Sequence, residues 1–307
     1  MKDTFNRKRH ILYLTRNGLL EPLGNSQVMS YLRGLAKFYK ITLITFEKDH
    51  DLKKKEAMYN AKTECLKHGI RWLPQRFRYS PKNIAPLISL LQMYLLVRQE
   101  IRKEKINLIH ARSYIPALVA LFVKKITGMP FIFDMRAIWP EELITAGRIS
   151  RGSLTHLVIL KIEKACLLNS NWVVSLTNVG VDYLKSKYHK KLDNQRFSVI
   201  PTCVDLKRFY PYEGERSNSL LHGCIGTILS GWFRLDWLKS WIHTAALSDP
   251  NSNFKIITRD DAKIIRLKID PYNQLDNKLF ISSMHFEEMP NAMRMHSFSV
   301  MFFTDGL

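Results

Sequence analysis

Charged and aromatic side chains gather directly after one predicted strand, Phe131–Met135, and these are Asp134, Arg136, Trp139, Glu141 and Glu142. Ligands of α/β sheets bind where the strands end, so a carboxylate here can orient substrate hydroxyl groups or take part in proton transfer. The alternative is a solvated loop in which Asp134 pairs with Arg136, because residues two apart in an extended segment share a face. Trp139 and Pro140 stiffen the loop, which favours the functional interpretation.

The preceding predicted strand, Leu108–Ala111, carries His110 and leads into Arg112. The guanidinium of Arg112 can bind a carboxylate or a phosphate through two parallel hydrogen bonds. His110 is either a catalytic group or a core histidine that is hydrogen-bonded to the backbone, and the sequence alone favours the second reading.

A loop with two glycines follows the first predicted strand, His10–Thr15, and ends at the start of a helix. Glycine lets a phosphate or a sugar approach the backbone, and the N–H groups at a helix N-terminus carry partial positive charge. Gly18, Gly24 and Asn25 are therefore candidate binding residues, and an ordinary turn is an equally weighted alternative. The loop lacks the GxGxxG and Walker patterns, which disfavours an NAD enzyme and a P-loop NTPase.

A similar loop, Gly226–Trp232, follows a later predicted strand, Cys224–Leu229. Gly226 and Thr227 suit a close backbone approach to a phosphate or a base. Arg259, after the next strand, can neutralise a diphosphate, or it can be a salt-bridged surface arginine. Asp260 and Asp261 resemble a helix N-cap rather than a pair of ligands.

Short β-branched runs alternate with helix-period segments along the 307 residues, which is the pattern of parallel βαβ units. We expect an α/β protein with two doubly wound domains, residues 1–205 and 206–307. The second domain shows four predicted strands, fewer than such a sheet usually has, and we therefore expect it to be incomplete. The remaining predicted strands are Ile41–Phe46, Ile70–Leu73, Trp172–Leu176, Ser198–Ile200, Phe254–Thr258, Lys278–Ile281 and Ser299–Phe303.

Several segments, in order, resemble bacterial family 4 glycosyltransferases, whose GT-B fold pairs two Rossmann-like domains across a cleft. They are ILYLTRNGLLEPLGNSQVMSYLRGLAKFYKITLITFEK (11–48), LIHARS (108–113), FDMRAIWPEE (133–142), VVSLT (173–177) and VIPTCVDLKRF (199–209). The resemblance implies a retaining transferase that moves a sugar from a nucleotide-sugar donor to a glycan or lipid-linked acceptor, as in polysaccharide biosynthesis. It also implies that Gly18, Gly24 and Asn25 contact the donor sugar and diphosphate.

The sequence departs from the family pattern at three places. The family's His-x-His segment reads His110-Ala111-Arg112 here, so a catalytic histidine cannot be transferred to the second position. The family's donor lysine beside Arg259 has no clear match. The carboxylate segment Glu-x7-Glu that completes the donor pocket does not occur before Leu307, so we expect weak turnover from the chain as given. Asp-Met-Arg is not the metal-holding Asp-x-Asp pair, so we expect neither a metal nor another cofactor.

Other functions on the same scaffold stay open. A nucleotide-sugar epimerase shares the fold, although the basic face argues for an acceptor. A non-catalytic remnant that binds only an acceptor or a membrane is a further alternative. The net charge of +20 also attracts nucleic acid, but nucleic-acid binding would leave the glycine loop and the Trp139 loop without a use, so we expect no nucleic-acid partner.

Basic residues are dense between Lys53 and Lys105, a segment that contains thirteen lysines and arginines and four glutamates. Trp72, Phe77 and Tyr79 interleave with Arg71, Arg76, Arg78 and Lys82, and the apolar stretch Ile84–Val97 follows directly. This combination suits docking on an anionic membrane surface. The equally weighted alternative is a sheet-covering helix beside a solvated basic rim. The stretch is too short to span a bilayer. The four scattered cysteines fit a reducing compartment, so we expect a cytoplasmic protein at the inner face of the plasma membrane.

Overall fold

The computed structural model describes residues 8–78, 85–211, 213–214 and 220–304. The chain divides into two compact units. The first comprises Met1–Pro140 and Gly152–Cys203, and the second comprises Glu141–Arg151 and Val204–Leu307. The path therefore crosses to the second unit at Val204, and the short segment 141–151 also groups with that unit.

The first unit is built on a parallel sheet of seven strands in the order β3-β2-β1-β4-β5-β6-β7. In chain order the strands are β1 (His10–Thr15), β2 (Lys40–Glu47), β3 (Ile70–Arg76), β4 (Leu108–Arg112), β5 (Phe131–Asp134), β6 (Trp172–Ser175) and β7 (Phe197–Val199). All seven predicted strands of this unit are confirmed to within two or three residues at their ends. The strand order reverses direction between β1 and β4, which is where doubly wound sheets bind their ligands.

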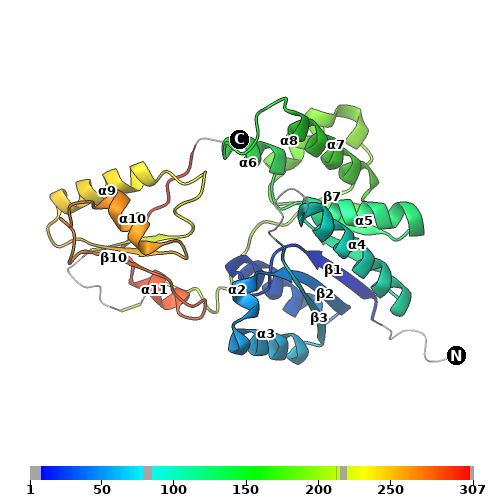
Figure 1. The fold of residues 1–307 in the computed structure, drawn as a ribbon, viewed down its shortest axis with the longest axis horizontal. Coiled ribbons are helices and arrows are strands. Elements are labelled where there is room, and N and C mark those ends of the chain that lie inside the picture. Colours follow the sequence, from blue (N-terminus) through cyan, green and yellow to red (C-terminus); the bar gives the residue numbers. More distant parts are fainter. Residues whose placement is uncertain (1–7, 79–84, 212, 215–219, 305–307) are drawn as a thin grey trace. The chain divides into compact units, whose positions relative to one another are not determined.

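Helices connect these strands and cover the sheet (Figure 1). They are η1 (Gly24–Met29), a π-helix, α1 (Ser30–Leu35), α2 (Asp49–Leu52), α3 (Lys55–Lys67), α4 (Ala85–Lys103), α5 (Tyr114–Thr127), α6 (Trp139–Thr145), α7 (Leu154–Asn169), α8 (Asn178–Tyr188) and η2 (His189–Leu192), a 3-10 helix.

The sheet of the first unit separates two apolar cores, because successive side chains of a strand point to opposite faces. Leu12 and Leu14 of β1 enter the core that includes residues of α4, α5 and α7, whereas Tyr13 enters the core beneath η1, α1 and α3. Side chains of β4 and β5 that share the face of Tyr13 therefore point toward η1. This alternation decides which polar residues meet at the end of the sheet.

The second unit repeats the beginning of the first. Its parallel sheet has the order β10-β9-β8-β11, with β8 (Leu221–Ile225), β9 (Asn253–Ile257), β10 (Leu279–Ser282) and β11 (Phe298–Ser299). The helices are α9 (Leu235–Ser248), α10 (Ala262–Ile269) and α11 (Met289–Met295). With its strands counted from one, this order is 3-2-1-4, as in the first unit. The expected α/β class with two Rossmann-like units is confirmed.

Two strand predictions in the second unit were wrong at their ends. β8 begins earlier than Cys224 and ends at Ile225, because Gly226 turns the chain with a φ of +150°, a conformation open to glycine. The predicted strand Ser299–Phe303 pairs with β8 only through β11, and Phe303 instead forms an isolated antiparallel bridge with Phe233.

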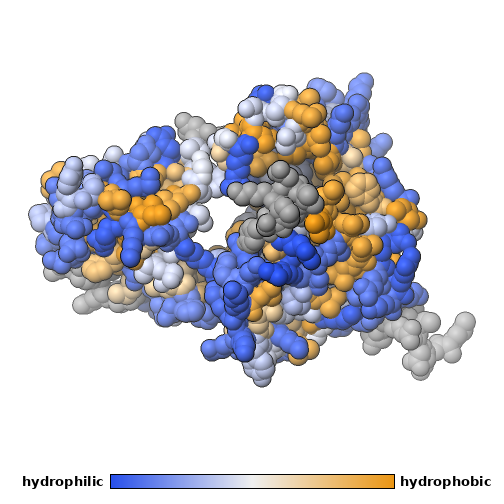
Figure 2. Space-filling model, viewed as in Figure 1, coloured by the Kyte–Doolittle hydropathy of each residue, from blue (hydrophilic) through white to orange (hydrophobic). Residues whose placement is uncertain are grey.

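The apolar stretch that the sequence places at Ile84–Val97 forms most of α4, although Ile84 itself lies outside the described residues. Met93 and Val97 are fully buried in the core. The face that Figure 2 displays carries apolar side chains over the first unit, and Leu87, Leu91 and Leu95 of α4 are exposed. Among the described helices, none is both long and apolar enough to cross a membrane.

Candidate active site

Two arginines and one histidine surround one buried carboxylate at the end of the sheet in the first unit. Arg112 of β4 and Asp134 of β5 are register partners, and His110 lies two residues before Arg112 on the same face. His110 Nε2 lies 3.2 Å from Asp134 Oδ2, Arg112 Nη1 lies 3.7 Å from the same oxygen, and Arg136 Nη1 lies 3.6 Å from Oδ1. The structure thus brings together four of the candidate site residues, His110, Arg112, Asp134 and Arg136.

Asp134 is ionised within this cluster. Burial alone would raise the pKa of its carboxyl, but the hydrogen bond from His110 and the positive charges of His110, Arg136 and Arg112 outweigh burial and lower the pKa. An ionised carboxylate only accepts hydrogen bonds, so His110 Nε2 must carry a proton. The His110 ring also stacks on Tyr13 with centroids 4.4 Å apart. The interpretation of His110 as a histidine bonded to the backbone was therefore wrong.

Gln27 of η1 joins the two arginines. Its Oε1 accepts from Arg112 Nη2 at 2.6 Å and from Arg136 Nη2 at 3.4 Å, and Arg136 also donates to Thr202 Oγ1 at 3.3 Å. Arg112 Nη1, Arg136 Nε and Asp134 Oδ1 are buried yet have no hydrogen-bond partner among the described residues. Buried polar atoms cost free energy when unpaired, so this cluster is suited to receive oxygen and hydroxyl groups of a ligand.

The glycine loop after β1 is packed against the protein itself. A Cβ on Gly18 would lie 3.2 Å from Phe46 O and would collide with Glu47, and a Cβ on Gly24 would lie 2.7 Å from Leu19 Cα. Gly24 begins η1 as predicted, and the N–H of Asn25 donates to Glu21 O at 3.1 Å. Both glycines are thus required by the packing of the loop against its neighbours.

Glu47, the last residue of β2, fixes this loop, and the sequence analysis overlooked it. Its carboxylate accepts from the N–H of Leu19 at 2.7 Å, from the N–H of Leu20 at 3.3 Å and from Thr45 Oγ1 at 2.6 Å. The side chain is fully buried. A signal was present in the sequence, because a glutamate directly follows the predicted buried strand Ile41–Phe46.

The start of the segment Trp139–Glu142 is held in place by Tyr114 and Glu163, two other residues that the sequence analysis missed. Tyr114 of α5 donates to Glu163 Oε2 at 2.6 Å and accepts from the Trp139 N–H at 3.3 Å. The Trp139 ring is half-buried, 5.3 Å from that of Tyr114. Glu141 is buried and accepts from Arg151 Nη2 at 2.7 Å, whereas Glu142 is exposed.

In the second unit, the loop after β8 carries the other predicted donor residues. Thr227 and Arg259 are exposed, and Gly226 makes the turn out of the strand. Asp260 Oδ2 accepts from the N–H of Ile228 at 2.6 Å and of Leu229 at 2.8 Å. The interpretation as an N-cap holds for Asp261, which caps α10, but it was wrong for Asp260, which binds the loop.

No group of three or more histidine, cysteine, aspartate or glutamate side chains that could hold a metal ion occurs within the described residues.

The two Rossmann-like units define the GT-B class, and comparisons with known proteins agree. The model of Glycosyltransferase Family 4 matches residues 24–208, more than half of the chain. The chain therefore belongs to glycosyltransferase family 4. No curated protein matches the sequence.

Solved structures share the fold across nearly the whole chain. Sucrose-phosphate synthase from Thermosynechococcus elongatus matches with a TM-score of 0.68 at 13% identity, over 95% of this chain and 75% of that one. Anabaena HepE in complex with UDP and glucose matches with a TM-score of 0.61 at 12% identity, over 95% of this chain and 73% of that one. A Listeria monocytogenes protein described as a UDP-N-acetylglucosamine 2-epimerase matches with a TM-score of 0.63 at 7% identity, over 96% of this chain and 74% of that one. At these identities the matches establish the fold.

Proposed function

We propose that this glycosyltransferase transfers a sugar from a nucleotide-sugar donor to a glycan or lipid-linked acceptor with retention of anomeric configuration. The observation that carries the proposal is the cluster of His110, Arg112, Asp134 and Arg136, whose unpaired buried polar atoms lie at the strand ends where the sheet order reverses. The solved complexes of HepE with UDP, UDP-glucose and glucose support a nucleotide-sugar donor.

In this proposal Asp134 acts as the ionised centre that orients the other three groups. Arg112 and Arg136 then present guanidinium N–H groups to a phosphate or carboxylate of the substrate, and charge that develops on a leaving phosphate is stabilised without reorganisation of the site. Asp134 Oδ1 accepts a hydrogen bond from an acceptor hydroxyl. Trp139, Glu141 and Glu142 form the acceptor segment.

A matched pair of aspartate variants tests the cluster. Asp134→Asn removes the negative charge beside His110, Arg112 and Arg136, and we expect donor turnover to fall about 100-fold or more. Asp182→Asn changes an exposed aspartate on α8 and serves as the control. The assay follows release of nucleoside diphosphate from a panel that includes UDP-glucose, with thermal melting as a check on folding. A folded Asp134→Asn protein that is as active as the control contradicts the proposal.

The product distinguishes the alternatives. A transferase yields free nucleoside diphosphate and a new glycosidic bond, whose anomeric configuration NMR reports. An epimerase returns an isomerised sugar, and a non-catalytic binding protein leaves the donor unchanged. At 7% identity, the similarity to the epimerase concerns the scaffold.

In this proposal Asn25, Gly226, Thr227 and Arg259 contact the donor, and no metal or other cofactor takes part. Gly18 and Gly24 shape the buried loop before Asn25 and do not themselves contact the donor. The positive charge that neutralises the diphosphate comes from arginine side chains, which bind phosphate without a cation. Turnover in EDTA equal to turnover in Mg²⁺ is the expected result. Arg259→Ser should weaken binding of the donor in calorimetry, with Arg196→Ser, an exposed arginine of the first unit, as the control.

We also propose that α4 docks on an anionic membrane surface at the cytoplasmic face, with the unpaired cysteines in keeping with a reducing compartment. Leu87, Leu91 and Leu95 recur every four residues and are 68%, 55% and 57% exposed, so they form one apolar stripe. Exposed Arg102 continues this stripe toward the end of α4 and suits anionic head groups.

The arginines singled out by the sequence contribute less to this surface than the stripe does. Arg71 forms a bidentate pair with Glu100, at 2.7 and 3.3 Å, and Arg76 forms one with Asp49, at 2.6 and 2.8 Å. Arg78 is exposed, and Tyr79 and Lys82 lie outside the described residues.

Co-sedimentation with vesicles tests the docking. Binding should rise with the fraction of phosphatidylglycerol, fall with salt, and drop strongly in Leu91→Gln/Leu95→Gln. Leu157→Gln/Val158→Gln, which changes two exposed apolar residues of α7, is the control. Equal binding to neutral vesicles, or equal binding by both variants, argues against the proposal.

A further inference from the structure

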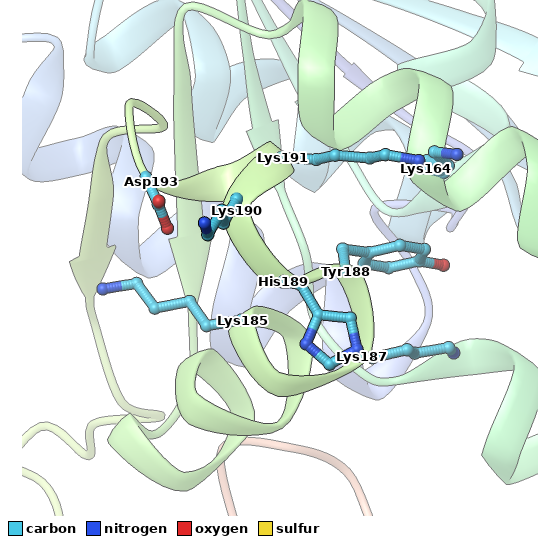
Figure 3. A pocket seen from close by; sticks show the side chains of 8 residues that line it. All are labelled: Lys164, Lys185, Lys187, Tyr188, His189, Lys190, Lys191 and Asp193. Atoms are coloured by element: carbon cyan, nitrogen blue, oxygen red, sulfur yellow. The ribbon is translucent and has the colours of Figure 1, made fainter.

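A basic pocket of about 730 Å³ lies at the junction of α7, α8 and η2 in the first unit. Figure 3 shows the side chains that line it, which are Lys164, Lys185, Lys187, Tyr188, His189, Lys190, Lys191 and Asp193. Five lysines thus share this pocket with one aspartate. Nothing in the proposed transfer reaction uses these residues.

The pocket lies away from the Asp134 cluster. Helices that connect parallel strands run back across the sheet, so their C-terminal ends lie at the edge where the strands begin. Lys164 is in the second half of α7, and Lys185 and Lys187 are in the last turn of α8. Asp134 is at the opposite edge, where β5 ends. A ligand of the pocket is therefore distinct from the donor sugar.

Part of the charge in the pocket is compensated by the protein. Lys187 Nζ pairs with the buried carboxylate of Glu163 at 3.0 Å, and Lys185 lies over the ring of Phe197. Among the described residues, no carboxylate lies within ion-pair distance of Lys164, Lys190 or Lys191. These three ammonium groups carry the uncompensated charge.

Two of these cations are forced together. The Lys191 side chain extends toward Lys164 (Figure 3), within hydrogen-bonding range, and this contact together with the charge of Lys191 lowers the pKa of Lys164. Like charges this close repel each other, and an anion that contacts both would convert the repulsion into attraction.

The turn that presents the lysines is anchored to the rest of the first unit. His189, the first residue of η2, has a φ of +47°, an unusual value for a residue other than glycine. The fully buried Leu192 anchors the following turn in the core, and Tyr188 donates to Glu163 Oε1 at 2.7 Å. The strained turn therefore holds Lys190 and Lys191 beside α7.

We propose that this pocket binds a phosphate group through Lys164, Lys190 and Lys191, either on a small phosphorylated molecule or on a lipid head group. Ammonium groups act as point charges for phosphate oxygens, and the adjacent Lys164 and Lys191, with Lys190 lining the same pocket, suit a dianionic or trianionic group. The site goes beyond the proposed transfer reaction and does not depend on it.

Calorimetry with inorganic pyrophosphate as the probe tests the site in the full chain. We expect saturable binding by the wild type and at least about a tenfold loss of affinity in Lys164→Gln/Lys191→Gln. Lys263→Gln/Lys268→Gln removes the same charge from two exposed lysines of α10 and should bind like the wild type. Lys164→Arg/Lys191→Arg keeps both charges and should retain binding, which separates charge from packing if the glutamine variant unfolds.

Vesicles distinguish the two sources of the phosphate. If the glutamine variant loses binding both to pyrophosphate and to phosphatidylglycerol vesicles, the ligand is a lipid head group. If only the pyrophosphate affinity falls, the ligand is a soluble phosphate. Absence of saturable pyrophosphate binding in the wild type, or equal affinities of the two glutamine variants, overturns the proposal.

Discussion

The loop after β1 (residues 16–23) and the loop after β8 (residues 226–232) occupy the same position in the two units. Each follows the first strand of a 3-2-1-4 arrangement, and each is tied down by a carboxylate from the neighbouring strand region. Glu47 binds the N–H groups of Leu19 and Leu20, and Asp260 binds those of Ile228 and Leu229. Backbone donors that could receive a ligand phosphate are thus occupied by the protein in both loops.

The two carboxylates differ in how they do this. Glu47 is fully buried and uses both oxygens for the two N–H groups, whereas Asp260 is half-buried and uses Oδ2 for both. The contacts that hold the β1 loop are therefore shielded from solvent, whereas the Asp260 carboxylate that holds the β8 loop is partly exposed to solvent. A ligand phosphate can compete with Asp260 at much lower cost than with Glu47, because burial opposes any exchange of Glu47.

Gly24→Ala should show the largest effect on the β1 loop. The added Cβ would lie 2.7 Å from Leu19 Cα and 2.8 Å from Leu19 C, which are backbone atoms that cannot rotate away. We expect a loss of about 3 kcal/mol in the free energy of unfolding, measured by urea denaturation. Gly34→Ala, where a Cβ meets no atom within 4 Å, should instead gain about 0.5 kcal/mol. Equal stability of the two variants would contradict the packing role of Gly24.

Glu47→Gln should cost about 2 kcal/mol at neutral pH, because an amide offers one oxygen where two are used. One backbone N–H is then left facing an NH₂ group in a buried site. Urea denaturation gives the free energy of unfolding, and Glu56→Gln, which changes an exposed glutamate of α3, is the matched control. A cost no larger than that of the control would show that the loop is held by other contacts.

The cost of Glu47→Gln should also depend on pH. Burial, outweighing the hydrogen bonds from Thr45, Leu19 and Leu20, raises the pKa of the Glu47 carboxyl above its ordinary 4.5. The folded protein then holds this proton more tightly than the unfolded chain does, so the wild type is most stable relative to the variant below pH 4.5. The difference should shrink as the pH rises through the folded pKa, by about 1.4 kcal/mol for each pKa unit of the shift. Denaturation series on both proteins measure it, and a constant difference would contradict the raised pKa.

Much of the fold was predictable because strands and helices leave local patterns. The run Ile41–Phe46 is apolar at every position except its threonines, and it forms the centre of β2. The position of Asp134 and Arg136 at the end of β5 followed from the rule that ligands bind where parallel strands end. The predicted ends of β8 and β11 were wrong, because Gly226 ends β8 and Phe303 forms an isolated bridge instead of extending β11.

The connections within the site were not predictable in the same way. Gln27 meets Arg112 across a sequence separation of 85 residues, and Tyr114 meets Glu163 across 49. Such pairs depend on strand order and on which face each side chain occupies, and neither is encoded in a local pattern. The burial of Glu47 likewise depends on the loop that covers it and not on its own neighbours in sequence.

Asp260→Asn should show the smallest effect and separates the two loops most directly. Because Oδ2 alone accepts from Ile228 and Leu229, an asparagine can turn its single oxygen to the same N–H groups. The substitution then only replaces a charged hydrogen-bond acceptor by a neutral one. We expect it to lower the free energy of unfolding by about 1 kcal/mol, half of the cost of Glu47→Gln. Asp261→Asn is the matched control, since asparagine caps a helix as well as aspartate and α10 should keep its stability. If Asp260→Asn costs as much as Glu47→Gln in urea denaturation, the β8 loop is as firmly held as the β1 loop. If it costs clearly less, the half-buried carboxylate is the exchangeable one, and the β8 loop is where a ligand phosphate can displace a protein group.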